Sequence, residues 1–113
     1  MTDTLFSKII NREIAADIVY EDDLCLAFRD INPQAPLHIL VIPKQAITKI
    51  ADAKDSDQSL LGHLLLKAGD IAREQGYADA FRLVINNGEK AGQTVFHLHV
   101  HILAGRDFSW PPG

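Results

Sequence analysis

Three of the five histidines in this 113-residue chain, His97, His99 and His101, alternate with apolar residues. This alternation predicts a β-strand with the three imidazoles on one face and the apolar side chains on the other. The Cα atoms of neighbouring histidines would be about 6.6 to 7 Å apart, which lets their imidazoles contact one small ligand such as a phosphate together. Burial of three adjacent titratable rings without a ligand is costly, so the row indicates a functional site.

Imidazoles in such a row can carry out chemistry on phosphorus without a metal ion. A neutral imidazole is a good nucleophile near pH 7, and a hydrogen bond to one ring nitrogen fixes the tautomer. The middle residue, His99, is the best placed to attack. His97 and His101 can stabilise the phosphoryl oxygens, and a nearby imidazolium can protonate a leaving amine.

A zinc site is the main alternative for the same row, because three imidazoles and a water molecule can form a catalytic zinc site. No carboxylate or thiol is obviously placed to complete it, and the glycine-containing loop 87–93 suits an anion, so we expect no metal. Cys25 lies in an apolar run and is expected to be an inert core thiol. His63 falls on a predicted helix, and we expect no catalytic role for it.

The sequence carries 15 acidic and 11 basic residues, a formal net charge of −4. Binding to a nucleic acid polymer usually relies on a basic surface, so we expect any nucleotide partner to be small. A single cysteine allows no intrachain disulfide and favours a reducing, cytoplasmic location. We expect no secretory signal and no membrane partner, because the longest apolar cluster, 60–66, is shorter than the ~20 residues that span a bilayer.

Hydrophobic periodicity predicts a single α+β domain over residues 1–113. Apolar residues at helical spacing indicate a short helix at 5–10 and a long helix at 56–75, which Gly76 would end. Because turn residues separate the first three predicted strands by hairpin-length intervals, the sheet should be antiparallel. The predicted strands are 18–20, 24–28, 37–42, 81–86 and 94–103.

Four segments of the chain together resemble one known family. The histidine row at 97–103 fits the motif His-φ-His-φ-His-φ-φ, where φ is apolar, and segments 6–10, 27–38 and 110–113 match the same family. The sequence thus resembles the histidine triad nucleotide-binding (Hint-like) proteins, in their branch of small dimeric nucleoside phosphoramidate hydrolases. The resemblance implies a five-stranded antiparallel sheet with two helices, and a sheet that continues across a two-fold homodimer.

The resemblance also implies an activity and its catalytic residues. A purine nucleoside phosphoramidate would be cleaved without a cofactor, and AMP or GMP would be released from an amine or lysine conjugate. His99 would form the nucleotidyl intermediate and His101 would donate to the phosphate. His97 would orient the site, with His38 beside the triad. Trp110 would reach the partner subunit's active site, although the sequence by itself leaves equal room for packing on its own subunit.

The other positions matched by the resemblance would bind the nucleotide. Asp30 would accept hydrogen bonds from the ribose hydroxyls, although its context before Asn32 and Pro33 is also that of a turn residue. The phosphate-side positions are Asn86, Gly92, Gln93 and Thr94, the last in place of the usual serine. The base pocket comprises apolar residues that would otherwise be taken as core: Leu5, Phe6, Ile9, Ile14, Phe28 and Ile31.

Two other functions remain open at this point. A sibling branch cleaves dinucleoside polyphosphates with the same nucleophile and a phosphate leaving group. A nucleotide-binding interaction protein would keep the fold but not the turnover. The short tail 110–113 favours the phosphoramidate branch, and the complete histidine set favours retained chemistry.

Overall fold

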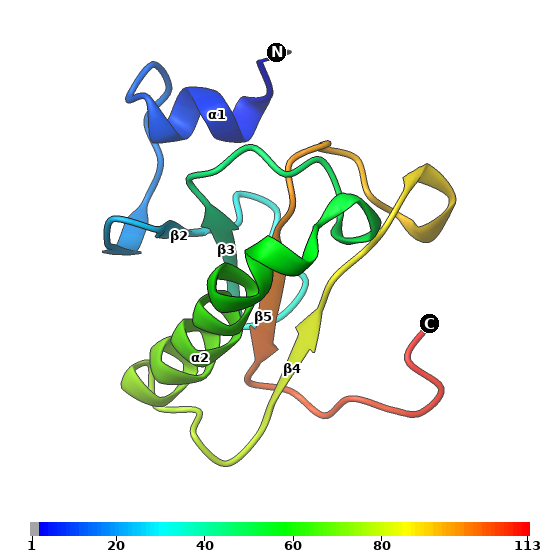
Figure 1. Ribbon diagram of the computed structural model, residues 1–113. Helices are drawn as coiled ribbons and strands as arrows, with labels where there is room; N and C mark the ends of the chain where they lie inside the picture. Colours follow the sequence, from blue (N-terminus) through cyan, green and yellow to red (C-terminus); the bar gives the residue numbers. More distant parts are fainter. Residues whose placement is uncertain (1–2) are drawn as a thin grey trace.

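The computed structural model describes residues 3–113 and contains one five-stranded sheet with two helices (Figure 1). The strand order is β1-β2-β3-β5-β4, and every neighbouring pair is antiparallel. The predicted α+β fold is therefore confirmed. No helix within 3–113 is both long and apolar enough to cross a membrane. The strands are β1 (Ile18–Glu21), β2 (Cys25–Arg29), β3 (Leu37–Pro43), β4 (Phe81–Val84) and β5 (Val100–Ala104), and the helices are α1 (Leu5–Ile10) and α2 (Gln58–Glu74).

The central strand β3 is buried along its whole length because both faces of the sheet are covered. On one face, Leu64 and Ile71 of α2 pack against alternate strand residues such as Ile39. Figure 1 shows α2 lying along β3 and β5 on this face. On the other face, Phe6 of α1 packs in a second cluster with Leu40. Two-sided burial explains why the sequence of β3 is almost continuously apolar.

The last strand is shorter than predicted, since β5 starts at Val100 and not at Thr94. The register of β3 with β5 ends where Val41 meets Val100, and the last two residues of β3, Ile42 and Pro43, pair only with β2. The preceding segment is held instead by the loop after β3, where Leu98 N–H donates to the Ile47 carbonyl at 2.7 Å. This contact holds the segment beside the loop after β3 without strand pairing.

Other boundaries differ from the predicted ones by one or two residues. Strand β4 ends at Val84, two residues earlier than predicted, where its register with β5 ends opposite His101. Helix α2 starts at Gln58 after a 3-10 turn over Asp55–Asp57. It ends at Glu74, one residue earlier than predicted, and Gly76 stops it as expected, with a left-handed φ of 93°. The N–H of Tyr77 then donates to the Ala72 carbonyl.

The carboxylate of Asp22 joins the β1–β2 hairpin to α2. Its Oδ1 accepts the backbone N–H groups of Leu24 and Cys25, both at 2.8 Å. Its Oδ2 accepts from the Tyr20 hydroxyl and contacts His63 Nε2 on α2, both at 2.7 Å. Partial burial acts to raise the pKa of Asp22, but these hydrogen bonds outweigh it and hold the pKa well below its usual range.

We expect Asp22→Asn to destabilise the fold by about 1 to 3 kcal/mol at pH 7, because an amide cannot accept all four hydrogen bonds. The folded pKa is depressed, so the contribution of Asp22 is present above the unfolded pKa of about 3.9 and declines as the pH falls below it. The loss should therefore shrink in urea unfolding experiments at acidic pH. Asp23→Asn, at the exposed neighbouring position, is the control and should change stability little. An equal loss in both variants would contradict the role of Asp22.

Candidate active site

The four histidines predicted to act together lie in one cluster. His97 and His99 precede β5, His101 lies in it, and His38 lies on the adjacent β3. The ring centres of His99 and His101 are 4.9 Å apart, and those of His38 and His101 are 5.2 Å apart. Phe6 of α1 covers the row, with its ring centre 4.9 Å from that of His99. The alternation thus places the imidazoles on the α1 side even where no strand ladder exists.

Backbone carbonyls fix the tautomers of two of these rings. His97 Nε2 lies 2.7 Å from the Pro43 carbonyl, and His99 Nδ1 lies 2.8 Å from the carbonyl of His97. A carbonyl oxygen can only accept, so both of these ring nitrogens carry a proton. When the ring is neutral, Nε2 of His99 therefore holds a lone pair. An imidazole nitrogen with a lone pair can act as a nucleophile.

The second pair of rings has the complementary arrangement. Gln34 N–H donates to Nδ1 of His38 at 3.1 Å, so the proton of neutral His38 is on Nε2. This Nε2 lies 2.9 Å from Nδ1 of His101, to which it donates, and 3.5 Å from Asp30 Oδ2. Neutral His101 consequently carries its proton on Nε2. A lone pair on His99 and an N–H group on His101 are thus offered by neighbouring rings.

Burial keeps these rings neutral at pH 7. It is the main cause that lowers the pKa of His97 and His99, in spite of the carbonyl hydrogen bonds that favour the charged form. Burial also lowers the pKa of His38, against the attraction of Asp30. For His101, burial and repulsion from the two neighbouring imidazoles lower the pKa to about 4. The cluster is therefore a set of neutral donors and acceptors in its ligand-free form.

An apolar cavity of about 260 Å³ opens beside His99 and His101. Asp30 and Thr94 also line it, so a carboxylate and a hydroxyl face the same space. Ile31 is 96% exposed, which leaves one wall of the cavity open to solvent. All six residues predicted to form the base pocket are among its lining: Leu5, Phe6, Ile9, Ile14, Phe28 and Ile31.

Asp30 fits both of the interpretations that the sequence left open. Its Oδ1 accepts the N–H of Asn32 at 2.8 Å, which is the local hydrogen bond of a turn residue. The other oxygen, Oδ2, points toward His38, and the side chain is partly exposed in the cavity. One oxygen thus shapes the loop while the other lies at the candidate site.

The predicted phosphate-side residues are divided by the structure. Thr94 lines the cavity. Gln93 is 1% exposed: its Oε1 accepts the Gly88 N–H, and its Nε2 donates to the carbonyls of Thr48 and Val95. Its side chain therefore braces the loop and does not line the cavity. Asn86 and Gly92 also lie outside the lining and face each other: a Cβ at position 92 would meet Asn86 Nδ2 at 3.7 Å.

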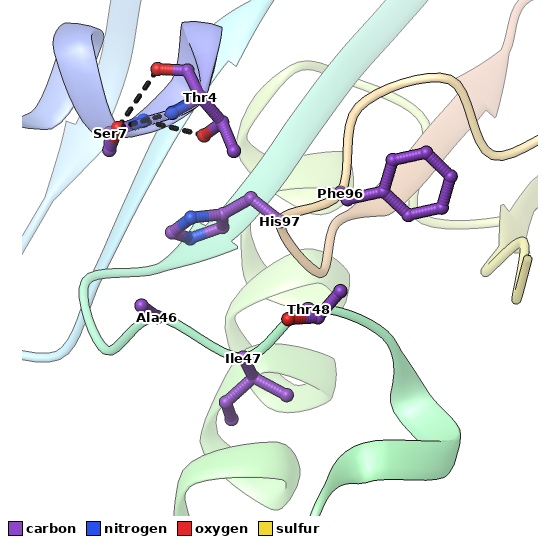
Figure 2. Close-up of a pocket in the computed structure, with 7 residues that line it drawn as sticks. All are labelled: Thr4, Ser7, Ala46, Ile47, Thr48, Phe96 and His97. Atoms are coloured by element: carbon purple, nitrogen blue, oxygen red, sulfur yellow. Dashed lines mark hydrogen bonds between the residues drawn. The ribbon is translucent and has the colours of Figure 1, made fainter. Parts of the chain in front are cut away.

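A second cavity, of about 480 Å³, adjoins His97 and was not indicated by the sequence. Figure 2 shows the His97 ring between Ser7 and Ala46, with Phe96 pointing the opposite way. Thr4 and Ser7 bond each other as a capping box of α1, so their hydroxyls are already engaged. The walls of this cavity come from three separate segments, which is why no local sequence pattern could predict it.

The structure also bears on the alternatives for Trp110, zinc and Cys25. Trp110 is 82% exposed, so the alternative that it packs on its own subunit's core is wrong. Among residues 3–113, ligand atoms converge within 4.8 Å in two trios: Asp30, His38 and His101, and Asp22, Cys25 and His63. The three triad histidines themselves do not form such a group. Cys25 is fully buried, and burial raises the pKa of its thiol to about 12, as expected for an inert core thiol.

Comparisons with known proteins identify the family. Residues 11–108 match the HIT domain family. A protein of Synechocystis, described as an uncharacterized HIT-like protein, is 67% identical over 98% of this chain and 97% of its own length. The 14 kDa zinc-binding protein of Zea mays is 51% identical over 97% of this chain and 88% of its own length. The chain therefore belongs to the HIT domain family, and the predicted resemblance to histidine triad proteins is confirmed.

Solved structures support the general class of activity. The crystal structure of a HIT family hydrolase from Legionella pneumophila has a TM-score of 0.96 and 47% sequence identity. The alignment covers 98% of this chain and 100% of the Legionella chain. This similarity supports a hydrolase in general and leaves the bond that is cleaved to be argued from the site.

We expect the resonances of the four clustered histidines of the ligand-free protein to titrate below the ordinary midpoint of about 6.5. In a ¹H–¹⁵N NMR titration, the midpoint of His101 should be about 4, and the midpoints of His97 and His99 should also lie below the ordinary value. Because unfolded histidines bind protons that these buried rings do not, the fold should lose stability as the pH falls below about 6.5. Phe6→Ala should raise the midpoint of His99 by exposing its ring. A wild-type midpoint for His99 at or above 6.5 would contradict the prediction.

Proposed function

We propose that this HIT family member hydrolyses purine nucleoside phosphoramidates and releases a nucleoside monophosphate from an amine or lysine conjugate. One observation carries the proposal: the contacts leave a lone pair on Nε2 of His99 and a proton on Nε2 of His101, beside an apolar cavity that includes Asp30. A nucleophile next to a donor suits attack on a phosphorus whose oxygens gain charge. The proposed chemistry uses no cofactor.

In the first step, His99 Nε2 attacks the α-phosphorus, and the bond from phosphorus to the amine nitrogen breaks. The leaving amine needs a proton. A bound phosphoryl anion raises the pKa of His101 from its low ligand-free value, because an opposite charge favours the imidazolium. His101 can then protonate the amine, and the nucleotide remains bonded to His99. The His97 carbonyl, which accepts from His99 Nδ1, stabilises the positive charge on that ring.

In the second step, water attacks the phosphorus and displaces His99. The water proton passes to His101, which was left neutral by the first step, and the nucleoside monophosphate is released. Before substrate binds, His38 acts on His101 from behind, because its Nε2–H holds the tautomer in which the outer nitrogen of His101 carries a proton. The atoms balance as one phosphoramidate and one water giving one nucleotide and one amine.

The cavity supports a purine nucleotide as the substrate class. Apolar walls on both sides give affinity for a flat ring with limited discrimination between bases, so AMP and GMP are both expected products. Asp30 is proposed to accept from the ribose hydroxyls with Oδ2, since Oδ1 already accepts from Asn32. Thr94 is the proposed hydroxyl on the phosphate side. Asn86, Gly92 and Gln93 are proposed to support this side through the loop that they pack.

We also propose a symmetric homodimer that joins at β4. β4 is an edge strand, so one row of its backbone groups has no strand partner within residues 3–113. Leu65 and Leu66 of α2 lie near this edge, and Leu66 is 72% exposed. A second copy across β4 would continue the sheet and cover these side chains. Trp110 is then proposed to contribute to the partner subunit's active site.

Other partners and activities are separated by the same experiments. Cleavage of diadenosine polyphosphates, with phosphate as the leaving group, is the nearest alternative. The name of the Zea mays relative and the convergence of Asp30, His38 and His101 make zinc binding the second candidate. We propose no membrane or nucleic acid polymer as a partner, and the buried, unpaired thiol of Cys25 supports the proposed cytoplasmic location.

His99→Asn should bind AMP nearly as well as the wild type but lose turnover of an adenosine phosphoramidate by about 10³-fold or more, since asparagine cannot form the covalent intermediate. His63→Asn is the matched control, because His63 bonds Asp22 on the α2 side and should be dispensable for turnover. Steady-state kinetics and AMP titration provide the two readouts. Near-native turnover by His99→Asn would show that another group attacks.

The same assay separates the alternatives. Wild-type protein dialysed against a strong chelator should keep its activity on the phosphoramidate, and loss of turnover that zinc restores would favour the metal candidate. Faster cleavage of a diadenosine polyphosphate than of the phosphoramidate would favour the sibling activity.

Asp30→Ala should make the enzyme almost indifferent to the 2′-hydroxyl of the substrate. Loss of a hydrogen bond to a charged group typically costs about 1.5 to 3 kcal/mol, or about 10- to 150-fold in kcat/KM. The wild type should therefore discriminate against the 2′-deoxy substrate, and the variant should not. Because Asp30 also bonds Asn32, Asp30→Asn serves as a second variant that keeps an acceptor for the turn. Equal discrimination by all three proteins would leave Asp30 as a turn residue only.

A further inference from the structure

The chain after β5 is fixed to the body of the protein, although most of it is exposed. It leaves β5 through Gly105, whose φ is 96° and where an added Cβ would meet Pro36 at 2.7 Å. Arg106 Nε then donates to the Gln34 carbonyl at 3.1 Å. Figure 1 shows the rest of this tail running from the end of β5 past β4. The tail is therefore tied at its start to the loop that precedes β3.

Phe108 is the second attachment point of this tail. Its ring lies near two guanidinium groups, with Arg106 at 4.3 Å and Arg82 of β4 at 5.0 Å from the ring centre. Guanidinium groups at these distances are attracted by the ring, and their flat faces add contact area. Arg82 also donates to the Ser109 carbonyl at 3.0 Å. We call Arg82, Arg106 and Phe108 the tail clamp.

Trp110 lies two residues after Phe108 and is 82% exposed. A large indole held in place on an exposed segment differs from an indole on a free chain end. A free end would lose conformational entropy each time it docked, whereas a segment that is already ordered loses little. Because the clamp already orders the tail, Trp110 can dock against another surface at a low entropic cost.

We propose that Arg82, Arg106 and Phe108 are positioning residues that hold the tail as an ordered arm and thereby set how Trp110 selects the leaving group. This inference rests on the proposed function, in which Trp110 contributes to the partner subunit's active site. The clamp residues touch neither substrate nor the reacting atoms. They act only through the orientation of the segment that carries the indole.

The chain contains one tryptophan, so its fluorescence reports on the tail directly. Time-resolved anisotropy of wild-type protein should show Trp110 turning with the whole molecule. Phe108→Ala should add a fast local motion, because the ring on which both arginines stack is gone. Phe108→Tyr keeps an aromatic ring and should behave as the wild type. Asp107→Ala is the matched control, since Arg106 bonds only the backbone oxygen at that position.

Kinetics supply the functional readout. For each variant, kcat/KM is measured with an adenosine phosphoramidate of a bulky aromatic amine and with one of a small alkyl amine. We expect Phe108→Ala to lose at least half of the selectivity that Trp110→Ala loses, mainly through a higher KM for the bulky substrate. Binding of AMP should not change, because the nucleotide cavity contains no clamp residue. Arg82→Gln should shift both readouts in the same direction.

The outcomes separate this inference from the function on which it rests. No phosphoramidate turnover by wild-type protein would overturn the proposed function and the selectivity role together, and the anisotropy would still decide whether the clamp orders the tail. Unchanged selectivity in Trp110→Ala would overturn the role of the arm while leaving turnover intact. Selectivity lost in Trp110→Ala but kept in Phe108→Ala, with unchanged anisotropy, would overturn the clamp alone.

Discussion

The hydrogen bond from His97 Nε2 to the Pro43 carbonyl is the contact on which the active site depends. It ties the segment before β5 to the last residue of β3, at a point where the sheet no longer pairs these two parts of the chain. With His97 fixed, its own carbonyl is placed to accept from His99 Nδ1. A buried imidazole without such a partner would be costly, so the need to satisfy two rings also determines the path of the backbone.

The remaining polar contacts extend this constraint in one direction. The backbone N–H of Gln34 donates to Nδ1 of His38, and Nε2 of His38 donates to Nδ1 of His101. Because Nδ1 accepts in each ring, the proton of each neutral ring is on Nε2. Beside the cavity, the cluster therefore presents an acceptor nitrogen, Nε2 of His99, next to a donor nitrogen, Nε2 of His101. Burial adds to this by suppressing the charged forms, which would otherwise repel one another. His101, whose pKa burial and the neighbouring imidazoles lower to about 4, lines the cavity, where a bound anion would favour its charged form.

The parts of this arrangement that follow from local pattern could be predicted from the sequence. Alternation placed the three imidazoles on one face, and this holds for His97 and His99 although neither lies in a strand. The Leu98 N–H bond to the Ile47 carbonyl holds their segment in place. The strand ends could not be predicted, since they depend on which residues of the neighbouring strands still pair. The predicted base pocket combines residues of separate segments, such as Leu5 and Phe28, and only resemblance to a known family linked them. Gln93 shows a further limit: its type suits a ligand, but its amide is used by the loop.

The single cysteine gives the protein a chemical property that its active site does not involve. Cys25 is fully buried, with a thiol that is protonated at neutral pH, so reagents that modify thiolates should not react with the folded chain. Modification requires the β1–β2 hairpin to separate from α2, and that separation breaks the contact between Asp22 and His63. In the regime where closing is faster than labelling, the labelling rate is proportional to the population of the open form. The chain therefore reports the opening free energy of this hairpin through its own side chain, without an introduced label.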